Sequence, residues 1–138
     1  MNAVFADTSY WIALVAENDK LRSKALEISI AVKATKVLTS EAVLTELLDG
    51  ASQRGAYQRD KVSSFVQSLI SSQSIEIISV SAKLFANAFS LFKLRLDKGW
   101  SMTDCISFVI CAEHNISEVL TYDHHFVQAG FVALLRGD

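Results

Sequence analysis

The sequence has too few cysteines for a disulfide-stabilised protein. Cys105 and Cys111 are the two cysteines in 138 residues, and they stand six apart within an apolar stretch. That spacing fits neither a disulfide framework nor a C-x-x-C metal or redox site. A chain of this length can bury a sizeable core without disulfides or structural metals. We therefore predict two buried, unpaired thiols in a cytoplasmic protein.

Long apolar runs and a basic excess are missing as well. Met1 to Ala6 lacks the charge and length of a signal peptide, and the later run at 10–16 is too short to span a bilayer. We expect no membrane contact. The net charge of −2 argues against tight non-specific binding of nucleic acid, but it leaves open a nuclease that contacts a phosphodiester through a metal.

The residues that are present predict one α/β domain over 1–138. Hydrophobic residues make up 51% of the chain and charged residues 20%, a balance that favours a folded core over disorder. Short apolar segments predict strands at 4–6, 36–39, 75–80, 118–121 and 131–135. Helical spacing of apolar residues predicts helices from Thr8, over 20–34, from Glu41, over 61–71, over 81–96 and from about Trp100 to Glu113, with a polar loop or interrupted helix at 49–60. This alternation predicts a five-stranded parallel sheet in the order 3-2-1-4-5, covered by helices on both faces.

Four acids are placed where such a sheet would bring them together. Asp7 and Asp123 each follow an apolar strand directly, so they belong to the same carboxyl edge of the sheet. Asp104 stands in the first turn of a buried helix that starts from this edge. Glu46 lies about 60° from Val43 on its helix, at the border of the apolar face.

Each acid has a simpler alternative when it is considered alone. Asp7 and Asp123 can cap the helices that follow them, and Ser101-x-x-Asp104 fits the pattern of a capping box. Glu46 can be a solvated residue at the edge of its helix. Four carboxylates in one crevice would repel one another and resist burial, unless a hard divalent cation compensates their charge. Such an ion suits phosphodiester hydrolysis.

Histidines and tryptophans add little to this prediction. His124 and His125 follow Asp123, but they are not an i, i+4 pair, and an oxygen-only site needs no imidazole. We therefore expect no transition-metal site here. Trp11 and Trp100 are interpreted as core residues rather than as platforms for stacking bases.

Four segments together resemble the PIN-domain proteins, and most of all the small VapC-type toxin ribonucleases of toxin–antitoxin modules. The segments are Asp7-Thr8-Ser9, Thr45-Glu46-Leu47, Trp100-Ser101-Met102-Thr103-Asp104-Cys105, and Leu120 to Phe126 followed by Ala129-Gly130-Phe131. The resemblance covers essentially the whole chain and includes every acid of the family's motif. It implies a three-layer PIN fold.

The resemblance also implies an activity and a site. Asp7, Glu46, Asp104 and Asp123 would bind Mg²⁺ or Mn²⁺, with hydroxyl support from Thr8, Ser9 or Thr103. The family's reaction is endonucleolytic cleavage of RNA by metal-activated water, which leaves a 3′-hydroxyl and a 5′-phosphate. Homodimers and an antitoxin that blocks the acidic pocket are further implications, although some relatives process RNA without being toxins.

Several assignments stay open at this stage. Candidates for phosphate contact are Arg54, Arg59, Arg95 and Lys98, and the alternative for each is a solvated surface charge. A receiver-type signalling domain would need another acid next to Asp7 and one after the third strand, where Ser81 stands. A haloacid-dehalogenase-type phosphatase would need an aspartate at Ser9. A catalytically silent interaction module on the same fold is the remaining alternative.

Overall fold

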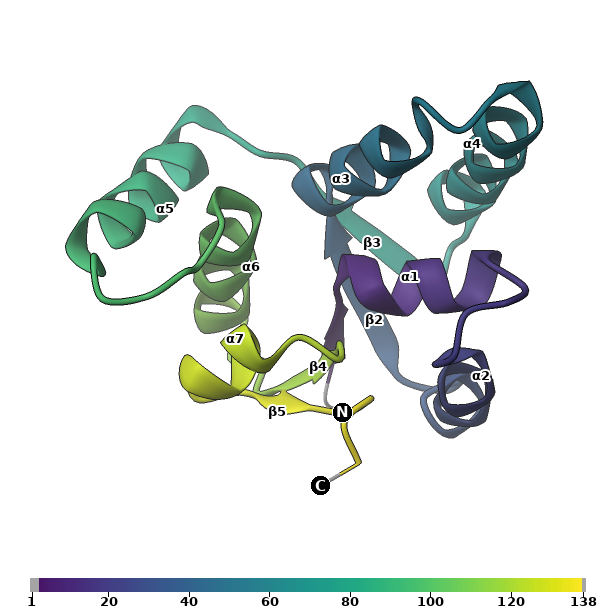
Figure 1. Ribbon diagram of the computed structural model, residues 1–138. Coiled ribbons are helices and arrows are strands. Elements are labelled where there is room, and N and C mark those ends of the chain that lie inside the picture. The colour runs from purple at the N-terminus through teal and green to yellow at the C-terminus, as the bar shows by residue number, and fades with distance from the viewer. Residues whose placement is uncertain (1–2, 138) are drawn as a thin grey trace.

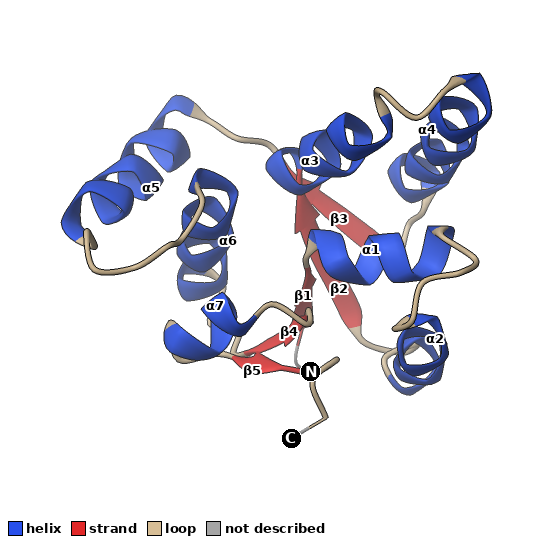
Figure 2. Ribbon diagram, viewed as in Figure 1, coloured by secondary structure: helices blue, strands red, loops and turns tan. Residues whose placement is uncertain are grey.

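The computed structural model describes residues 3–137, so the ends of the predicted 1–138 domain, residues 1, 2 and 138, lie outside the described residues. Within 3–137 one parallel sheet contains five strands (Figure 2). They are β1 (Ala3–Ala6), β2 (Lys36–Ser40), β3 (Ile75–Ile78), β4 (Glu118–Leu120) and β5 (Val132–Ala133). Their order is β3-β2-β1-β4-β5, and every pairing is parallel, which confirms the predicted topology.

Helices cover both faces of the sheet. In the described residues they are α1 (Thr8–Val15), α2 (Arg22–Ala31), α3 (Glu41–Ala51), α4 (Ala56–Ser71), α5 (Ala82–Leu94), α6 (Met102–Glu113) and α7 (His124–Gln128). Figure 1 shows α1 to α4 gathered on one side of the sheet and α5 to α7 on the other. The fold is therefore the expected three-layer α/β/α arrangement. None of the helices within 3–137 is long and apolar enough to cross a membrane.

The segment 49–60, predicted as a polar loop or an interrupted helix, is an interrupted helix. Helix α3 continues to Ala51 and α4 begins at Ala56, five residues before the predicted start at Lys61. Gly50 costs the helix about 1 kcal/mol relative to alanine, but Ala51 is buried, so packing outweighs local propensity. The chain turns at Gly55 instead, whose φ of 92° lies in the region that favours glycine.

The strand register sets the position of the carboxyl edge. Phe5 pairs with Val119 and Ala6 with Leu120, and the backbone N–H of Asp7 then donates to the carbonyl of Leu120 at 3.1 Å. Strands β1 and β4 therefore end side by side. The residues that follow them, Asp7 and Thr121, leave the sheet as direct neighbours.

An aromatic cluster anchors the short helix α7 against α6. Phe126 on α7 is fully buried, and its ring meets the ring of Phe108 edge-on with centroids 4.9 Å apart. Phe131 and Trp100 pack on other sides of Phe108, at 5.7 and 5.0 Å. Each such contact adds about 0.5–1.5 kcal/mol beyond the burial of area. This packing fixes the residues at the start of α7 relative to the start of α6.

Candidate active site

Asp7 is the most deeply buried of the four acids, with 5% of the residue exposed. It occupies the N-cap position of α1, yet its side chain makes no capping hydrogen bond. Burial raises the pKa of its carboxyl from 3.8 to about 7, opposed by hydrogen bonds from the Thr8 backbone and the Thr121 hydroxyl. The nearby charges of Asp104 and Glu46 raise it further. Helix capping therefore does not account for this carboxylate.

A network of hydroxyl groups holds the tips of β1 and β4 together. Thr121 donates from Oγ1 to Asp7 Oδ2 at 3.0 Å. Thr121 Oγ1 also accepts the backbone N–H of Asp123 at 3.0 Å. Ser9 Oγ lies 3.2 Å from Thr121 Oγ1 and accepts the backbone N–H of Tyr122. Ser9 was predicted as a supporting hydroxyl, whereas Thr121 was not singled out. Its one sequence signal is its place at the end of β4, directly before Tyr122-Asp123.

We expect Thr121→Val to lower the free energy of unfolding by about 1–3 kcal/mol, since it leaves Asp7 Oδ2 without a donor and the Asp123 N–H without an acceptor. Urea denaturation of the metal-free protein measures this effect. The control is Thr121→Ser, which keeps the hydroxyl and should recover most of the loss. If Thr121→Val is as stable as wild type, the hydroxyl network contributes nothing to stability.

Glu46 reaches the same edge from α3. The Thr8 hydroxyl donates a short hydrogen bond to Glu46 Oε1, which links α3 to the first turn of α1. Glu46 itself is exposed, which is the solvated alternative for an acid at the edge of the apolar face. The Thr8 hydroxyl thus contacts one of the four acids, and its role as a supporting hydroxyl stays a prediction.

Asp104 has both a structural contact and an electrostatic one. Its Oδ2 accepts the backbone N–H of Ser101, and Ser101 Oγ accepts the N–H of Asp104, which completes the capping box of α6. Burial raises the pKa of the Asp104 carboxyl, the Ser101 backbone opposes this, and the charge of Asp123 raises it again. The capping alternative is correct for Asp104, but it does not remove this carboxylate from the cluster.

Asp123 caps α7, because its Oδ1 accepts the backbone N–H of His125 at 2.9 Å. The same oxygen lies 3.0 Å from His125 Nδ1 and 3.8 Å from His124 Nδ1. Across residues 3–137 the group of three possible ligands within 4.8 Å of one another is Asp123, His124 and His125. The charges of the acids affect one another's pKa values. The group of closely spaced possible ligands, however, includes the two histidines, at which we expected no transition-metal site.

The other predicted site residues stay predictions, and each has contacts of its own. Arg95 forms a two-pronged pair with Asp97 at 3.0 Å and Lys98 lies 3.9 Å from the same carboxylate, so both charges are partly compensated. Arg59 donates to the carbonyl of Ser52, and Arg54 lines a hollow at the C-terminal end of α1, opposite the end that carries Asp7. Thr103 lines a hollow of about 600 Å³ between α3, α5 and α6, together with Thr45 and Phe85.

The sulfur and tryptophan predictions are confirmed. Both cysteines are unpaired and buried, and burial raises the pKa of Cys111 to about 12, which keeps it a neutral thiol. Trp11 and Trp100 are core residues with 3% and 7% exposure. Their indole N–H groups are satisfied by Thr39 and Gln128.

Comparison with known families identifies this arrangement. Residues 4–132 match the family model of the PIN domain. The chain belongs to the PIN-domain family. A comparison with curated proteins found no match.

Solved structures resemble this PIN domain along nearly its whole length. VapC20 of Mycobacterium tuberculosis, a toxin that cleaves the sarcin-ricin loop, is 25% identical, with a TM-score of 0.83 over 94% of this chain and 97% of that one. VapBC2 of Rickettsia felis, bound to a promoter DNA fragment, is 19% identical, with a TM-score of 0.66 over 95% and 96%. FitAcB of Neisseria gonorrhoeae is 20% identical, with a TM-score of 0.62 over 94% of each chain. The last two bear on the fold alone.

Proposed function

We propose that this PIN domain is a divalent-metal-dependent endoribonuclease, and that it is the toxin of a type II toxin–antitoxin pair. The observation that carries the proposal is the buried Asp7 carboxyl, whose pKa is raised to about 7 beside Asp104 and Glu46. A protein gains nothing in stability from burying an uncompensated acid. A cation bound at this position would stabilise the ionised carboxylate that burial disfavours.

The chemistry of the donors fits Mg²⁺ or Mn²⁺. Asp7, Asp104 and Asp123 supply carboxylate oxygens, and Glu46 on α3 supplies a fourth carboxylate. Asp104 and Asp123 each use one oxygen in a helix cap, so each has a second oxygen for an ion or its water. Hard divalent ions take such oxygen ligands and leave positions for phosphate.

The side chains of this chain hold the geometry in which hydrolysis proceeds. When bound, the ion neutralises charge and polarises the phosphoryl group and the attacking water. Thr121 orients Asp7, the Ser101 backbone orients Asp104, and Thr8 orients Glu46. In the reaction the water oxygen bonds to phosphorus, the bond to the 3′ oxygen breaks, and a proton passes to that oxygen. The products are a 5′-phosphate and a 3′-hydroxyl.

RNA is the preferred substrate because VapC20 is itself a toxin that cleaves an RNA loop and covers nearly the whole of this chain. A small protein partner that acts as antitoxin belongs to the same proposal, because VapC20, which this chain resembles along nearly its whole length, is a toxin. A cytoplasmic homodimer is part of the same proposal. A PIN nuclease that processes RNA outside any toxin–antitoxin pair is the alternative, and an adjacent antitoxin gene would separate the two.

Cleavage of structured RNA by the purified chain tests this function. We expect cleavage with Mg²⁺ or Mn²⁺, none with EDTA, and little cleavage of DNA of the same sequence. Mapping the ends should find 5′-phosphates. The matched control is Asp97→Asn, which removes an exposed carboxylate outside the cluster and should cleave like wild type. Equal cleavage in EDTA, or products that end in cyclic phosphate, would contradict a metal-dependent hydrolysis.

A further inference from the structure

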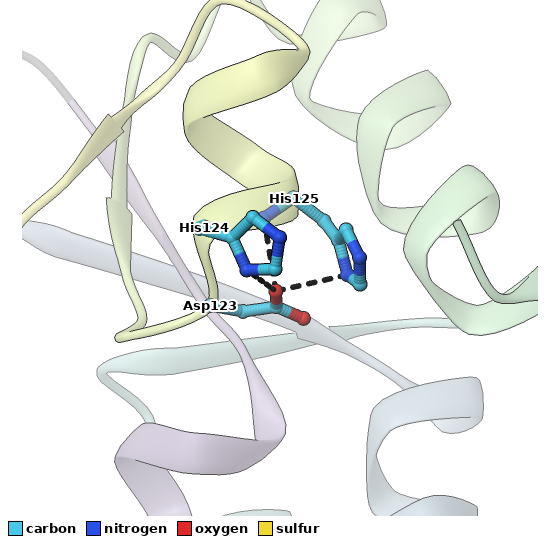
Figure 3. Close-up of side chains that lie close together, drawn as sticks. All are labelled: Asp123, His124 and His125. Atoms are coloured by element: carbon cyan, nitrogen blue, oxygen red, sulfur yellow. Dashed lines mark hydrogen bonds and ion pairs between the residues drawn. The ribbon is translucent and has the colours of Figure 1, made fainter. Parts of the chain in front are cut away.

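Two neighbouring histidines turn toward one carboxylate at the start of α7. Figure 3 shows the rings of His124 and His125 beside each other, each linked by a dashed line to the Asp123 carboxylate. Their ring centroids lie 4.3 Å apart. The nitrogen that faces the acid is Nδ1 in both, at 3.8 Å for His124 and 3.0 Å for His125 from Asp123 Oδ1.

His125 Nδ1 is a buried nitrogen without a hydrogen bond in the described residues. It has carboxylate oxygens nearby on two sides, Asp123 Oδ1 at 3.0 Å and Asp104 Oδ2 at 3.4 Å, but it forms a directed bond with neither. Its other nitrogen, Nε2, lies 3.8 Å from the position that a Cβ at Gly99 would occupy. A buried polar atom that lacks a hydrogen bond amid possible ligands is a sign of an absent partner.

The separations between these atoms are those of a metal's ligand shell. A bond length of about 2.1 Å to nitrogen or oxygen places adjacent ligands about 3.0 Å apart in an octahedron and about 3.4 Å apart in a tetrahedron. The observed separations of 3.0 and 3.4 Å match these values, and the separation of 3.8 Å is wider. The ligand atoms of Asp123, His124 and His125 all lie within 4.8 Å of one another, so side-chain adjustments would be needed to bring them around one ion.

Packing keeps these residues in place without an ion. Fully buried Phe126 follows His125 directly and locks the first turn of α7 against Phe108 of α6. The capping box fixes Asp104 at the start of the same helix α6. Ligands held in this way favour an ion whose size and geometry match them.

We propose that Asp123, His124 and His125 bind one transition-series divalent ion in preference to Mg²⁺, with Zn²⁺ as the probe. Imidazole nitrogen suits Zn²⁺ and its neighbours, whereas Mg²⁺ prefers oxygen ligands alone. Asp7 and Glu46 are not ligands of this ion. The proposal rests on the proposed function only in that Asp123 would serve both ions.

Zinc binding to the metal-free full-length chain tests the proposal without any cleavage assay. Competition with a chromophoric chelator should give one Zn²⁺ per chain, retained in a millimolar excess of Mg²⁺. His125→Gln should weaken binding by roughly tenfold or more. The matched control is His114→Gln, which replaces a histidine at the far end of α6 whose Nδ1 lies 3.0 Å from the Ile110 carbonyl, and it should bind like wild type.

Two further variants place the site and guard against misfolding. Asp7→Asn should keep its affinity for Zn²⁺, and His124→Gln, which replaces an exposed ring, should lose affinity without loss of metal-free stability. Equal Zn²⁺ affinity in wild type, His124→Gln and His125→Gln overturns the proposal. So does loss of binding in Asp7→Asn, or displacement of Zn²⁺ by Mg²⁺. Because cleavage is not measured, an inactive nuclease would leave these results unchanged.

Discussion

Asp7→Asn should abolish metal-dependent cleavage and, in the absence of metal, make the protein more stable at neutral pH. The variant removes the charge of the acid that burial opposes most strongly, and it keeps an amide of the same shape against Thr121. Loss of an ion that polarises the phosphoryl group costs several kcal/mol of transition-state stabilisation, so cleavage should fall by roughly a thousandfold or more. One substitution thus has opposite effects on catalysis and stability.

The dependence of stability on pH follows from the direction of the shift in pKa. The folded pKa of Asp7 is about 7 and the ordinary value is 3.8, so the folded state binds more protons between these values. The free energy of unfolding of the metal-free wild type therefore falls as pH rises from about 4 to 7, by roughly 4 kcal/mol from this group. The Asp7→Asn variant lacks this slope. At pH 8 it should exceed wild type by about 2–4 kcal/mol.

Urea denaturation of metal-free protein at pH 5 and pH 8 measures both effects. Asp97→Asn is the matched control because it makes the same change in charge at an exposed acid, whose pKa is lowered to about 2 by its hydrogen bond with Arg95. This control should gain no stability at pH 8. Added Mg²⁺ should then stabilise wild type more than Asp7→Asn, through binding to the native state. A loss of metal-free stability in Asp7→Asn would mean that the carboxylate is a structural partner.

The sequence predicts the edge of the sheet well because its signals there are local. Each strand end can be recognised from a few consecutive residues. One apolar segment stops at Asp7, and another stops before Tyr122-Asp123. Parallel order then brings the two tips together. The position of Glu46 could also be predicted from local sequence, since its angle from Val43 on one helix places it at the edge of the apolar face.

The contacts that hold the candidate site residues next to one another join distant parts of the chain, so no local sequence pattern predicts them. The hydrogen bond from Thr121 to Asp7 links residues 114 apart in sequence. The approach of His125 to Asp104 depends on aromatic packing between α6 and α7. Spacing rules for histidine ligands look for pairs on one helical face, so they miss adjacent residues that turn toward a shared carboxylate at a helix start.

For Asp104, capping and the proposed metal binding are not alternatives. A carboxylate has two oxygens with several acceptor positions, and the capping box uses Oδ2 for the backbone N–H of Ser101. The negative charge stays, and it contributes to the raised pKa of Asp7. A sequence pattern for a cap therefore carries no evidence against a second role for the same residue.

Asp104→Asn and Ser101→Ala should separate these two roles. The asparagine keeps an oxygen for the Ser101 N–H but loses the charge, so we expect metal-free stability close to wild type and cleavage reduced by roughly a hundredfold or more. Ser101→Ala keeps the carboxylate and removes the hydroxyl that accepts the Asp104 N–H. It should cost about 1 kcal/mol of stability and leave cleavage close to wild type.

Asp104→Ala combines both losses and completes the comparison, because it should be as inactive as the asparagine variant and less stable than it. Chemical denaturation and cleavage rates under saturating Mg²⁺ measure the two quantities on the same preparations. If Ser101→Ala loses cleavage as severely as Asp104→Asn, activity depends on the start of α6 being capped, and Asp104 acts through the fold. If Asp104→Asn is inactive while Ser101→Ala cleaves like wild type, the charge is required where the capping box holds it, beside Asp7 and Asp123.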